Sequence, residues 1–538
     1  MSPMHSKIPC ILPSAIALMN QPIEINSQFK KAIEIMENTD KNVFITGKAG
    51  TGKSTLLGYF RSVTKKNIVV LATTGVAAVN IEGETAHSFF GFKPDITLDK
   101  VKKIGGKRAS IYKKLDAIVI DEVSMMRSDL LDCVDKFLRL NGKDAYRPFG
   151  GAQMLFFGDL YQLPPVVTGM EREIFRTHYA SPYFFDANVF QDCHLEFVEL
   201  EKIYRQKDDG FIVLLNSIRN NSIAEEGLAA LNARLGAPLE RSGTAGFTIT
   251  LTTTNLMAAI LNEEHLGRLK TKIHTYDAEI TGSFKEQSFP AEKNLNIAGG
   301  AQVMLLNNDP GDRWVNGTLG RVIDMEPGEE GEPDGILVEL AGGKIAKILP
   351  YTWEIFHYRY DGSEKAIKTE TVGSFTQYPI KLAWSVTIHK SQGKTFDRVI
   401  IDMGNGAFAH GQTYVALSRC TTLEGISLKK PIKKSHVLLD WRIVKFMTGH
   451  QYKVSEENMS LKKKLDLIRR AIKEKGRLDI VYLKASDEKS RRVVKPISVG
   501  DMVYLDKPFT GMKAWCEKRR EERVFRVDRI LEMKEAGG

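Results

Sequence analysis

The sequence predicts a multidomain α/β protein with a small β-rich unit at its C-terminal end. Three observations predict this fold. The length of 538 residues is too great for one hydrophobic core. Near residue 50 an apolar strand passes through a glycine-rich turn into a helix, and after residue 300 short strands alternate with turns. The hydrophobic fraction of 43% and the charged fraction of 26% are those of an ordinary globular protein, which excludes a fibrous or disordered chain.

Positive charge is concentrated at the C-terminal end. Residues 451–538 carry 23 Lys and Arg against 15 Asp and Glu, so this segment holds +8 of the net +10 of the whole chain. A basic unit on a nearly neutral body indicates a polyanion partner. On charge alone, a solvated lysine-rich face explains the same excess equally well.

The cysteines and the apolar segments indicate a cytoplasmic protein. The chain has five scattered cysteines, none in a CxxC pair: Cys10, Cys133, Cys193, Cys420 and Cys516. This usage argues against a disulfide framework or a zinc site and suits a reducing compartment. The mildly apolar stretch Ile8–Met19 is interrupted by Pro9 and Pro13, and no apolar run reaches 18 residues. We therefore expect neither a signal peptide nor a membrane span.

A nucleotide site is predicted in the segment Asn42–Leu57, which reads as a buried strand, a glycine-rich turn and a helix start. Residues 47–54 match the GxxxxGK[ST] pattern, whose backbone N–H groups and helix N-terminus face phosphate oxygens. Lys53 is expected to reach the β- and γ-phosphates of ATP, and the Ser54 hydroxyl to bind Mg²⁺. The expected nucleotide-binding residues here are Gly47, Ala49, Gly50, Thr51, Gly52, Lys53, Ser54 and Thr55.

Two carboxylates complete the predicted hydrolytic site. Asp121 and Glu122 follow the continuously apolar stretch Ala117–Ile120, which is typical of a central strand buried on both faces. We expect Asp121 to hold the Mg²⁺ shell and Glu122 to orient or deprotonate the attacking water. Gln162, in the loop after another apolar strand, is expected to sense the γ-phosphate. That loop is weak evidence by itself, because Gly-Asp and Pro-Pro also mark ordinary turns.

Seven motifs occur in order, and together they are more specific than any one of them. They are GKAGTGKST (47–55), TTGVAAVNIEGETAHSFFGF (73–92), IDEVSMM (120–126), GDLYQLPPV (158–166), YRQ (204–206), SVTIHKSQGKTFDRVIID (385–402) and GQTYVALSRC (411–420). In this set the chain resembles the Pif family of DNA helicases, in the RecD-like branch of helicase superfamily one, over roughly residues 25–445. The resemblance implies two RecA-like domains with ATP between them and single-stranded DNA across their tops.

The resemblance also implies roles for single residues near the nucleotide. Arg205 and Arg419 match the family's two arginine fingers, whose planar guanidinium group engages phosphate oxygens in pairs. Gln28 stands where the family has a glutamine that reads adenine. Alternatively, Gln28 is a polar residue at a helix start that is capped by Asn26 or Ser27.

Tracking along a single strand needs phosphate donors and flat surfaces on which bases stack. The Thr73–Gly75 segment follows an apolar strand, so its donors should lie at the carboxyl edge of the sheet. Phe89 and Phe90 are more readily interpreted as core side chains. With the contacts implied by the resemblance, the expected DNA-binding residues of the motor are Thr73, Thr74, Gly75, His87, Ser88, Thr387, His389 and Ser391.

Four domains are expected. The first RecA-like domain covers 20–200, with a small insertion near 84–112, and the second covers 201–307 and 375–448. A small SH3-like β-barrel at 308–374 interrupts the second domain. A linker near Gly449–Asn458 leads to an accessory unit at 459–536.

The accessory unit resembles a WYL domain, a small β-rich ligand-binding fold. The residues VYL (481–483), Tyr504 and RVFRVDRI (523–530) carry the resemblance, although Val481 replaces the tryptophan of the family name. Arg519, Arg523 and Arg526 are expected to form a basic face for nucleic acid. A basic rim around an ordinary barrel core is the alternative for any one of them.

The expected function is that of an ATP- and Mg²⁺-dependent DNA helicase in the bacterial cytoplasm or nucleoid, with no membrane partner and a monomeric motor. The resemblance implies 5′→3′ movement and roles in replication, repair and recombination, on forks and on G-quadruplexes. Two alternatives stay open. One is a DNA-stimulated ATPase that translocates without separating strands. The other is a nucleic-acid-binding regulator in which the WYL-like unit is the active part.

Overall fold

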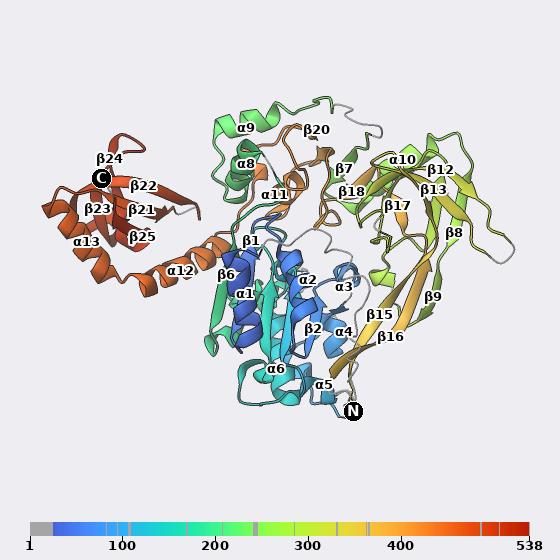
Figure 1. The fold of residues 1–538 in the computed structure, drawn as a ribbon, viewed down its shortest axis with the longest axis horizontal. Helices are drawn as coiled ribbons and strands as arrows, with labels where there is room; N and C mark the ends of the chain where they lie inside the picture. Colours follow the sequence, from blue (N-terminus) through green and yellow to red (C-terminus); the bar gives the residue numbers. More distant parts are fainter. Residues whose placement is uncertain are drawn as a thin grey trace, which may run out of the picture. The chain divides into compact units, whose positions relative to one another are not determined.

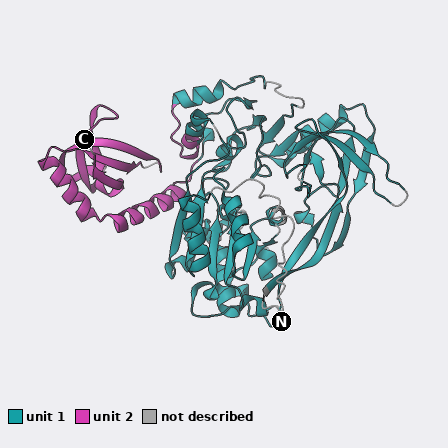
Figure 2. Cartoon of the chain, viewed as in Figure 1, with its two compact units in different colours: residues 1–215, 225–438 teal, residues 216–224, 439–538 magenta. Residues whose placement is uncertain are grey.

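The computed structural model describes residues 25–536 except 82, 94, 106–108, 168–170, 207, 240–245, 285, 312, 330–331, 362, 364–365, 485–486 and 505. The chain divides into two compact units (Figure 2). The larger unit comprises Met1–Leu215 and Glu225–Leu438, and the smaller unit comprises Asn216–Ala224 and Leu439–Gly538. The smaller unit therefore begins earlier in the chain than the expected 459–536.

A six-stranded parallel sheet forms the first domain of the larger unit, in the order β3-β2-β4-β5-β1-β6. The carboxyl ends of parallel strands meet at one edge, so the loops after β1, β2, β4 and β5 come together there. These loops carry the glycine-rich turn, the Thr73–Gly75 segment, the acidic pair and the GDLYQ segment. The strands are β1 (Asn42–Gly47), β2 (Ile68–Ala72), β3 (Glu84–Thr85), β4 (Ala117–Asp121), β5 (Gln153–Phe157) and β6 (Leu195–Leu200).

Helices connect these strands and cover the sheet (Figure 1). They are α1 (Ser27–Asn38), α2 (Lys53–Val63), α3 (Gly75–Asn80), α4 (Ala86–Phe90), α5 (Ala109–Tyr112), α6 (Ser128–Asn141) and α7 (Arg172–His178). All five residues of β5 and the first four of β4 are buried, as the apolar runs predicted. Phe89 and Phe90 are 2% and 3% exposed and pack against Tyr112. The core interpretation of these two aromatics is confirmed.

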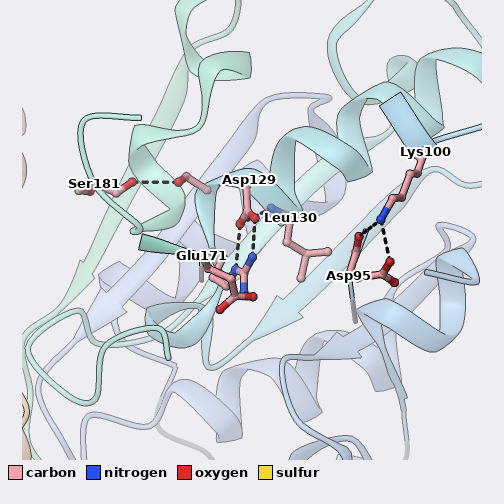
Figure 3. Close-up of polar contacts among 8 residues, drawn as sticks. Asp95, Lys100, Asp129, Leu130, Glu171 and Ser181 are labelled. Atoms are coloured by element: carbon pink, nitrogen blue, oxygen red, sulfur yellow. Dashed lines mark hydrogen bonds and ion pairs between the residues drawn. The ribbon is translucent and has the colours of Figure 1, made fainter. Parts of the chain in front are cut away.

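Polar contacts fix the segment that leads from the acidic pair into α6. Arg127 Nε donates to Asp129 Oδ1 at 2.9 Å, and another nitrogen of the same guanidinium pairs with Glu171 (Figure 3). The Ser128 hydroxyl donates to the carbonyl of Ser181 at 2.9 Å. The loop after β4 is thus anchored a few residues beyond Asp121, which limits how far the carboxylates can move.

A second parallel sheet, in the order β18-β7-β19-β20, forms the other domain of the larger unit. Strand β7 leads directly into helix α10, which Thr254 caps by accepting from the Met257 N–H. The strands are β7 (Ile249–Thr252), β18 (Ser385–Thr387), β19 (Val399–Asp402) and β20 (Ile426–Leu428). The helices are α8 (Asp209–Arg219), whose residues 216–219 belong to the smaller unit, α9 (Glu225–Asn232), α10 (Asn255–Gly267) and α11 (Gln412–Leu417).

A β-rich segment lies between α10 and β18. Its strands form a five-stranded sheet (β14-β13-β12-β11-β17), a three-stranded sheet (β15-β16-β9) and the pair β10-β8. They are β8 (Ile273–Asp277), β9 (Glu279–Gly282), β10 (Asn294–Ala298), β11 (Gln302–Leu305), β12 (Leu319–Glu326), β13 (Gly335–Leu340), β14 (Ile345–Ile348), β15 (Tyr351–Asp361), β16 (Ala366–Gln377) and β17 (Ile380–Leu382). This range is wider than the expected 308–374, because β11 pairs with β12 and β17 and not with the parallel sheet.

The long ribbon of β15 and β16 reaches back to the first domain (Figure 1). The Tyr358 hydroxyl accepts from the Val70 N–H at 3.1 Å and lies 3.3 Å from the Val70 carbonyl. Its ring packs edge-on against Phe89 at 5.7 Å between centroids. The insertion therefore touches the strand that precedes the Thr73–Gly75 loop.

The smaller unit pairs two helices with a five-stranded antiparallel sheet, in the order β24-β23-β22-β21-β25. Its helix α13 (Leu461–Lys473) is followed by strand β21 (Leu478–Leu483). The other strands are β22 (Lys489–Tyr504), β23 (Lys507–Cys516), β24 (Glu521–Arg526) and β25 (Ile530–Glu535). The core contains Ile468, Leu478, Ile480, Val494, Met512 and Phe525.

The expected linker at 449–458 is wrong, because α12 (Trp441–Asn458) runs through it. Asp440 caps this helix by accepting from the Arg442 N–H. Near its other end, the buried Ser455 hydroxyl donates to a carbonyl of Ile530 or Leu531 and accepts from the buried Lys464 ammonium at 2.7 Å. These tertiary contacts hold the segment helical despite its internal glycine.

No helix within residues 25–536, outside the gaps noted above, is long and apolar enough to cross a membrane. The four described cysteines are free thiols, and Cys10 lies outside the described residues.

Gly411 tests how tightly the two parallel-sheet domains are packed. Its φ is +72°, and a Cβ there would lie 2.2 Å from the Gln162 carbonyl oxygen. We expect Gly411→Ala to lower the melting temperature clearly, because both backbone strain and a backbone clash result. The matched control is Gly236→Ala, where φ is +61° but no atom lies within 4 Å, so only the strain of about 1–2 kcal/mol applies. Equal melting temperatures for the two variants would contradict the close approach.

Candidate functional site

The glycine-rich turn has the geometry of a phosphate-binding loop. Gly50 and Gly52 adopt φ of +81° and +87°, and α2 begins directly after them at Lys53. The Lys53 ammonium folds over the loop and donates to the carbonyls of Gly47 (2.7 Å) and Lys48 (3.2 Å). Backbone N–H groups at such a turn and a lysine on its rim suit a polyphosphate.

The acidic pair stands at the end of β4. Glu122 has a left-handed backbone with φ of +49°, and its N–H donates to Asp121 Oδ1 at 2.9 Å. Burial and then the charge of Glu122 raise the pKa of Asp121 to about 7. Burial also raises the pKa of Glu122, against the opposing charges of Lys53 and Arg419. Two poorly solvated neighbouring carboxylates favour a bound cation, and the Ser54 hydroxyl with Asp121 is an all-oxygen set that suits Mg²⁺.

The two predicted finger arginines lie beside each other. Arg419 is 1% exposed, and its guanidinium donates to the Val415 carbonyl and the Ser418 hydroxyl, both at 2.9 Å. Burial and then the charge of Arg205 lower the pKa of Arg419 to about 9. Arg205 donates to the Ser418 carbonyl at 3.3 Å. Among the described residues neither arginine forms an ion pair with a carboxylate, so an anion near them would be strongly favoured.

The YRQ segment covers the tip of the phosphate loop. The Tyr204 N–H donates to the Gly50 carbonyl at 2.8 Å, and a Cβ on Gly50 would lie 2.5 Å from the Arg205 Cβ. The glycine at position 50 is therefore required both by its backbone angle and by this contact. Arg205 is placed directly against the loop that would hold the phosphates.

Contacts between the two parallel-sheet domains include residues to which the sequence gave no role. The Tyr414 hydroxyl accepts from the Ala49 N–H at 2.9 Å, and Gln206 Nε2 lies 3.2 Å from the Ser418 carbonyl. Gln392 Nε2 donates to Glu122 Oε2 at 3.0 Å. These residues lie inside the recognised motifs, but only the packing of the domains brings them to the acidic pair and the loop.

Gln162 is buried next to this junction. It is 5% exposed, and its amide lies 3.5 Å from the carboxylate of Asp159, which is fully buried. Gly411, at the start of α11, packs on the Gln162 backbone. A sensor role for Gln162 remains a prediction, but its backbone is in direct contact with the second domain.

Gln28 lies at the start of α1, where Asn26 caps the helix by accepting from the N–H groups of Gln28 and Phe29. The Gln28 amide bonds twice to Glu201, accepting from its N–H at 3.0 Å and donating to its carboxylate at 3.1 Å. The expected cap is confirmed. Reading of adenine by Gln28 stays a prediction.

Comparisons with known proteins agree with this geometry. Residues 23–227 match the model of the PIF1-like helicase, and residues 463–535 match the model of the WYL domain. The ATP-dependent DNA helicase Pif1 of Bdellovibrio bacteriovorus is 30% identical over 418 residues, which cover 76% of this chain and 88% of that protein. The chain belongs to the PIF1-like helicase family.

Two further relatives define the extent of the likeness. The Danio rerio ATP-dependent DNA helicase PIF1 is 34% identical over 395 residues, covering 72% of this chain. The chain spans only 58% of the length of that relative. The crystal structure of Bacteroides sp Pif1 in complex with ADP-AlF4 has a TM-score of 0.71 and 36% identity, and covers 80% of this chain and 98% of that one. The family likeness thus covers the larger unit, and the WYL domain adds to it.

In the first domain, only some of the residues that are expected to contact DNA are exposed. Thr74 is exposed, and its hydroxyl accepts from the Ala77 N–H at 3.2 Å, which caps α3. The Thr73 hydroxyl is buried without a hydrogen-bond partner among the described residues, and Gly75 packs against Ser288. These positions lie at the carboxyl edge of the sheet, as the sequence predicted.

His87 and Ser88 are both half-buried. The Ser88 hydroxyl donates to Glu84 Oε1 at 2.6 Å, and His357 of the ribbon lies 3.8 Å from the same carboxylate. In this arrangement Ser88 is occupied by the contact between strand β3 and the ribbon. Its contact with DNA remains a prediction.

Two residues of the second domain that are expected to contact DNA have buried hydroxyls, and their contact with DNA stays a prediction. Thr387 is 4% exposed and accepts from the Lys390 N–H, and Ser391 is fully buried and donates to the Ile388 carbonyl at 2.7 Å. Both hydroxyls thus point into the fold and shape the loop, because the turn must satisfy its own backbone groups. His389 between them is half-buried and stacks on Phe408 at 6.4 Å.

A lysine cluster beside this loop was not anticipated from the sequence. Burial, then the charges of Lys394 and Lys390, lower the pKa of Lys381 to about 7, while Glu292 opposes them. Burial lowers the pKa of Lys394 to about 8, and its ammonium donates to Asn316 of the inserted segment. These lysines come from β17 and from the loop that follows β18. Only the tertiary structure brings them together.

The predicted basic face of the WYL domain is largely neutralised. Arg523 pairs with Glu521 at 2.6 Å, and Arg526 pairs with Asp528 at 2.7 Å. Arg519 is exposed. Pairs on a solvated surface contribute little to stability, but a bound phosphate would have to displace them. The number of basic residues in the sequence therefore overstated the positive charge that this face can offer to an anion.

Lys381 should make the stability of the chain depend on pH. The pKa of Lys381 is about 7 in the folded chain and near 10.4 in the unfolded chain. Between these two pH values the unfolded chain holds a proton that the folded chain has lost, so the free energy of unfolding rises with pH in this window. Below about pH 7 the lysine is charged in both states and the full cost of burial applies. Lys381→Met should therefore raise the melting temperature by about 1–3 °C near pH 6, with the gain shrinking toward pH 9. The exposed Lys344→Met is the control, and a gain independent of pH would contradict the assignment.

Proposed function

We propose that this chain is an ATP-dependent DNA helicase that couples hydrolysis of Mg-ATP to movement on single-stranded DNA. The proposal rests on one observation: charged side chains from both parallel-sheet domains meet at the phosphate loop. Lys53 and the acidic pair come from the first domain, Arg419 comes from the second, and Arg205 packs against the phosphate loop. Neither guanidinium pairs with a carboxylate among the described residues. A polyphosphate is the anion that this arrangement fits.

Each side chain has a distinct role in this proposal. Lys53 exchanges its two loop carbonyls for the β- and γ-phosphates of ATP. Glu122, released from Gln392, orients the attacking water and accepts its proton. Bound Mg²⁺, held by Ser54 and Asp121, would neutralise phosphate charge. Arg205 and Arg419 stabilise the charge that develops on the γ-phosphoryl group during transfer.

The proposed coupling to DNA runs through Arg419. Its guanidinium also lies 3.5 Å from the Ser391 carbonyl and 3.3 Å from the Lys394 carbonyl. Those carbonyls belong to the loop that carries His389 and two lysines of the cluster. A shift of Arg419 toward the γ-phosphate would therefore pull on that loop, which gives a direct mechanical link between hydrolysis and the proposed DNA contacts.

Single-stranded DNA and forked duplexes are the proposed substrates. The structure of Bacteroides Pif1 bound to single-stranded DNA is 37% identical, with a TM-score of 0.57. A structure that describes unwinding at forked double-stranded DNA by two coordinating Pif1 helicases is also 37% identical, with a TM-score of 0.59. The 5′→3′ polarity, the action on G-quadruplexes and the monomeric motor rest on the family resemblance alone. They are proposed as the finer part of the function.

Strand displacement tests the proposal. The wild-type chain should separate a duplex with a 5′ single-stranded tail and leave one with a 3′ tail intact. Glu122→Gln should retain ATP binding but lose turnover, because only water activation is removed, and Lys53→Ala should lose turnover through lost phosphate contact. Hydrolysis stimulated by DNA without displacement of either substrate would favour the translocase alternative. Near-native turnover by Glu122→Gln would disprove its role as the base.

The two arginines give a second test. Arg205→Ala and Arg419→Ala should each bind single-stranded DNA but lose DNA-stimulated hydrolysis, since such groups contribute about 10³–10⁵ in rate where they act in trans. Arg398→Ala, a change of equal charge away from the phosphate loop, is the control. A loss below about tenfold for both finger variants would show that neither reaches the γ-phosphate. Arg419→Lys separates geometry from charge, because the buried donors to Val415 and Ser418 require the planar group.

A further inference from the structure

A cavity of about 580 Å³ opens in the smaller unit, within the range of 300–1,000 Å³ that is usual for small-ligand sites. It lies mainly along the first three turns of α12, outside the strands of the WYL sheet. Its lining includes Asn220, Asn221, Trp441, Lys445, Tyr452 and Arg529. No carboxylate is among these residues.

The cations of the cavity differ from the other arginines of the smaller unit. Among the described residues, neither Lys445 nor Arg529 forms an ion pair. The nearest acids in the sequence are engaged elsewhere: Asp440 pairs with Arg442, and Asp528 pairs with Arg526. Two uncompensated positive charges therefore face one cavity, which favours an anionic ligand.

Aromatic side chains accompany these charges. Trp441 is 67% exposed, and the Lys445 ammonium lies 5.9 Å from the centroid of its ring. Tyr452 lines the same cavity, and burial raises the pKa of its hydroxyl. Within the described part of the chain, the polar atoms of Trp441 and Tyr452 make no hydrogen bond. An exposed indole beside a cation offers a stacking surface and a phosphate contact at one place.

Two asparagines form a further part of the lining. Asn220 and Asn221 follow α8 and belong to the smaller unit. Asn220 is 6% exposed, and its amide is engaged by the protein itself, because its Nδ2 donates to the Asp487 carbonyl and its Oδ1 accepts from Arg219, both at 3.3 Å. These contacts fix one wall of the cavity, so the aromatic and cationic side chains are the groups that can recognise a ligand.

We propose that this cavity binds a nucleoside phosphate, with the base on Trp441 and the phosphate between Lys445 and Arg529. The same chemistry is offered by a free nucleotide and by one unit of single-stranded DNA. The site goes beyond the proposed function, because the phosphate loop and the arginine fingers lie in the other unit. Only the DNA source depends on the proposed helicase activity.

Photo-crosslinking of the full-length chain tests the site with matched probes. One probe is 5-iodo-deoxyuridine monophosphate, and the other is a single-stranded oligodeoxythymidylate carrying 5-iodo-deoxyuridine. The crosslinked peptide is identified by mass spectrometry after proteolysis. We expect a crosslink within Trp441–Tyr452 with at least one probe, and the probe that gives it identifies the source.

Two double variants of equal charge locate the contact. Lys445→Ala with Arg529→Ala should lower the crosslink yield at this peptide about tenfold, since two charge-assisted contacts are lost. For the DNA probe, the log–log salt slope of binding should also fall by about 1.4. Arg523→Ala with Arg526→Ala, which removes the same charge from ion-paired positions, should leave the yield nearly unchanged. Lys445 is exposed and Arg529 is half-buried, so neither substitution removes a core side chain, and circular dichroism checks the fold.

Two outcomes would overturn the proposal. One is the absence of any crosslink in Trp441–Tyr452 with both probes. The other is an equal loss for the two double variants, which would indicate a diffuse electrostatic effect and no built site. Neither outcome depends on ATP turnover, because the crosslink is read without it. If only the helicase proposal failed, the chain would not displace strands in the assay above, but the crosslink within Trp441–Tyr452 would still form.

Discussion

The buried guanidinium of Arg419 is the interaction on which the arrangement of the larger unit depends. Its donors engage the Val415 carbonyl of α11 and the Ser418 hydroxyl, and reach toward the carbonyls of Ser391 and Lys394. A charge with 1% exposure and only neutral hydrogen-bond partners is costly, and its pKa is lowered accordingly. That cost is offset when an anion arrives, so the same group that organises the loop also favours the phosphate.

The acidic pair is held under the opposite constraint. Asp121 and Glu122 repel each other while poorly solvated, and the left-handed backbone of Glu122 fixes their relative direction. The contacts of Arg127 with Asp129 and Glu171 anchor the chain that follows. The strained backbone and the repulsion between the two carboxylates persist at this turn because contacts with the surrounding sheet hold it in place. Such features are typical of functional positions. Acids on one side and arginines on the other leave a place suited to a metal–polyphosphate complex.

The smaller unit shows that the number of basic residues is a poor guide to where unpaired positive charge lies. Arg523 and Arg526 stand in a basic sequence, yet both are paired with neighbouring acids. Lys445 and Arg529 are separated by 84 positions and share one cavity without a carboxylate. The electrostatic field at a site depends on which charged side chains lack an ion-pair partner after folding. In the smaller unit this depends on how α12 packs against the sheet.

The sequence by itself determined the local elements and the chemistry of the nucleotide site. Apolar runs and turn residues located β1, β4 and β5, because strands buried on both faces leave continuous apolar runs in the sequence. The phosphate loop is a contiguous motif, so Lys53 and Ser54 could be placed from spacing alone. Ordered motifs also indicated Arg205 and Arg419, but not that they would lie side by side.

Only the tertiary structure decided which strands share a sheet and which side chains face solvent. The strand at Gln302–Leu305 belongs to the insertion because its hydrogen-bond partners are β12 and β17. The sequence of a single strand does not show which other strands it pairs with. The hydroxyls of Thr387 and Ser391 turned inward, and the segment after Gly449 became a helix through contacts such as Ser455 with Lys464. The lysine cluster, the contact between Tyr414 and Ala49, and the cavity beside Trp441 all join residues distant in the chain. Such contacts arise from packing, which the spacing of residues along the sequence does not encode.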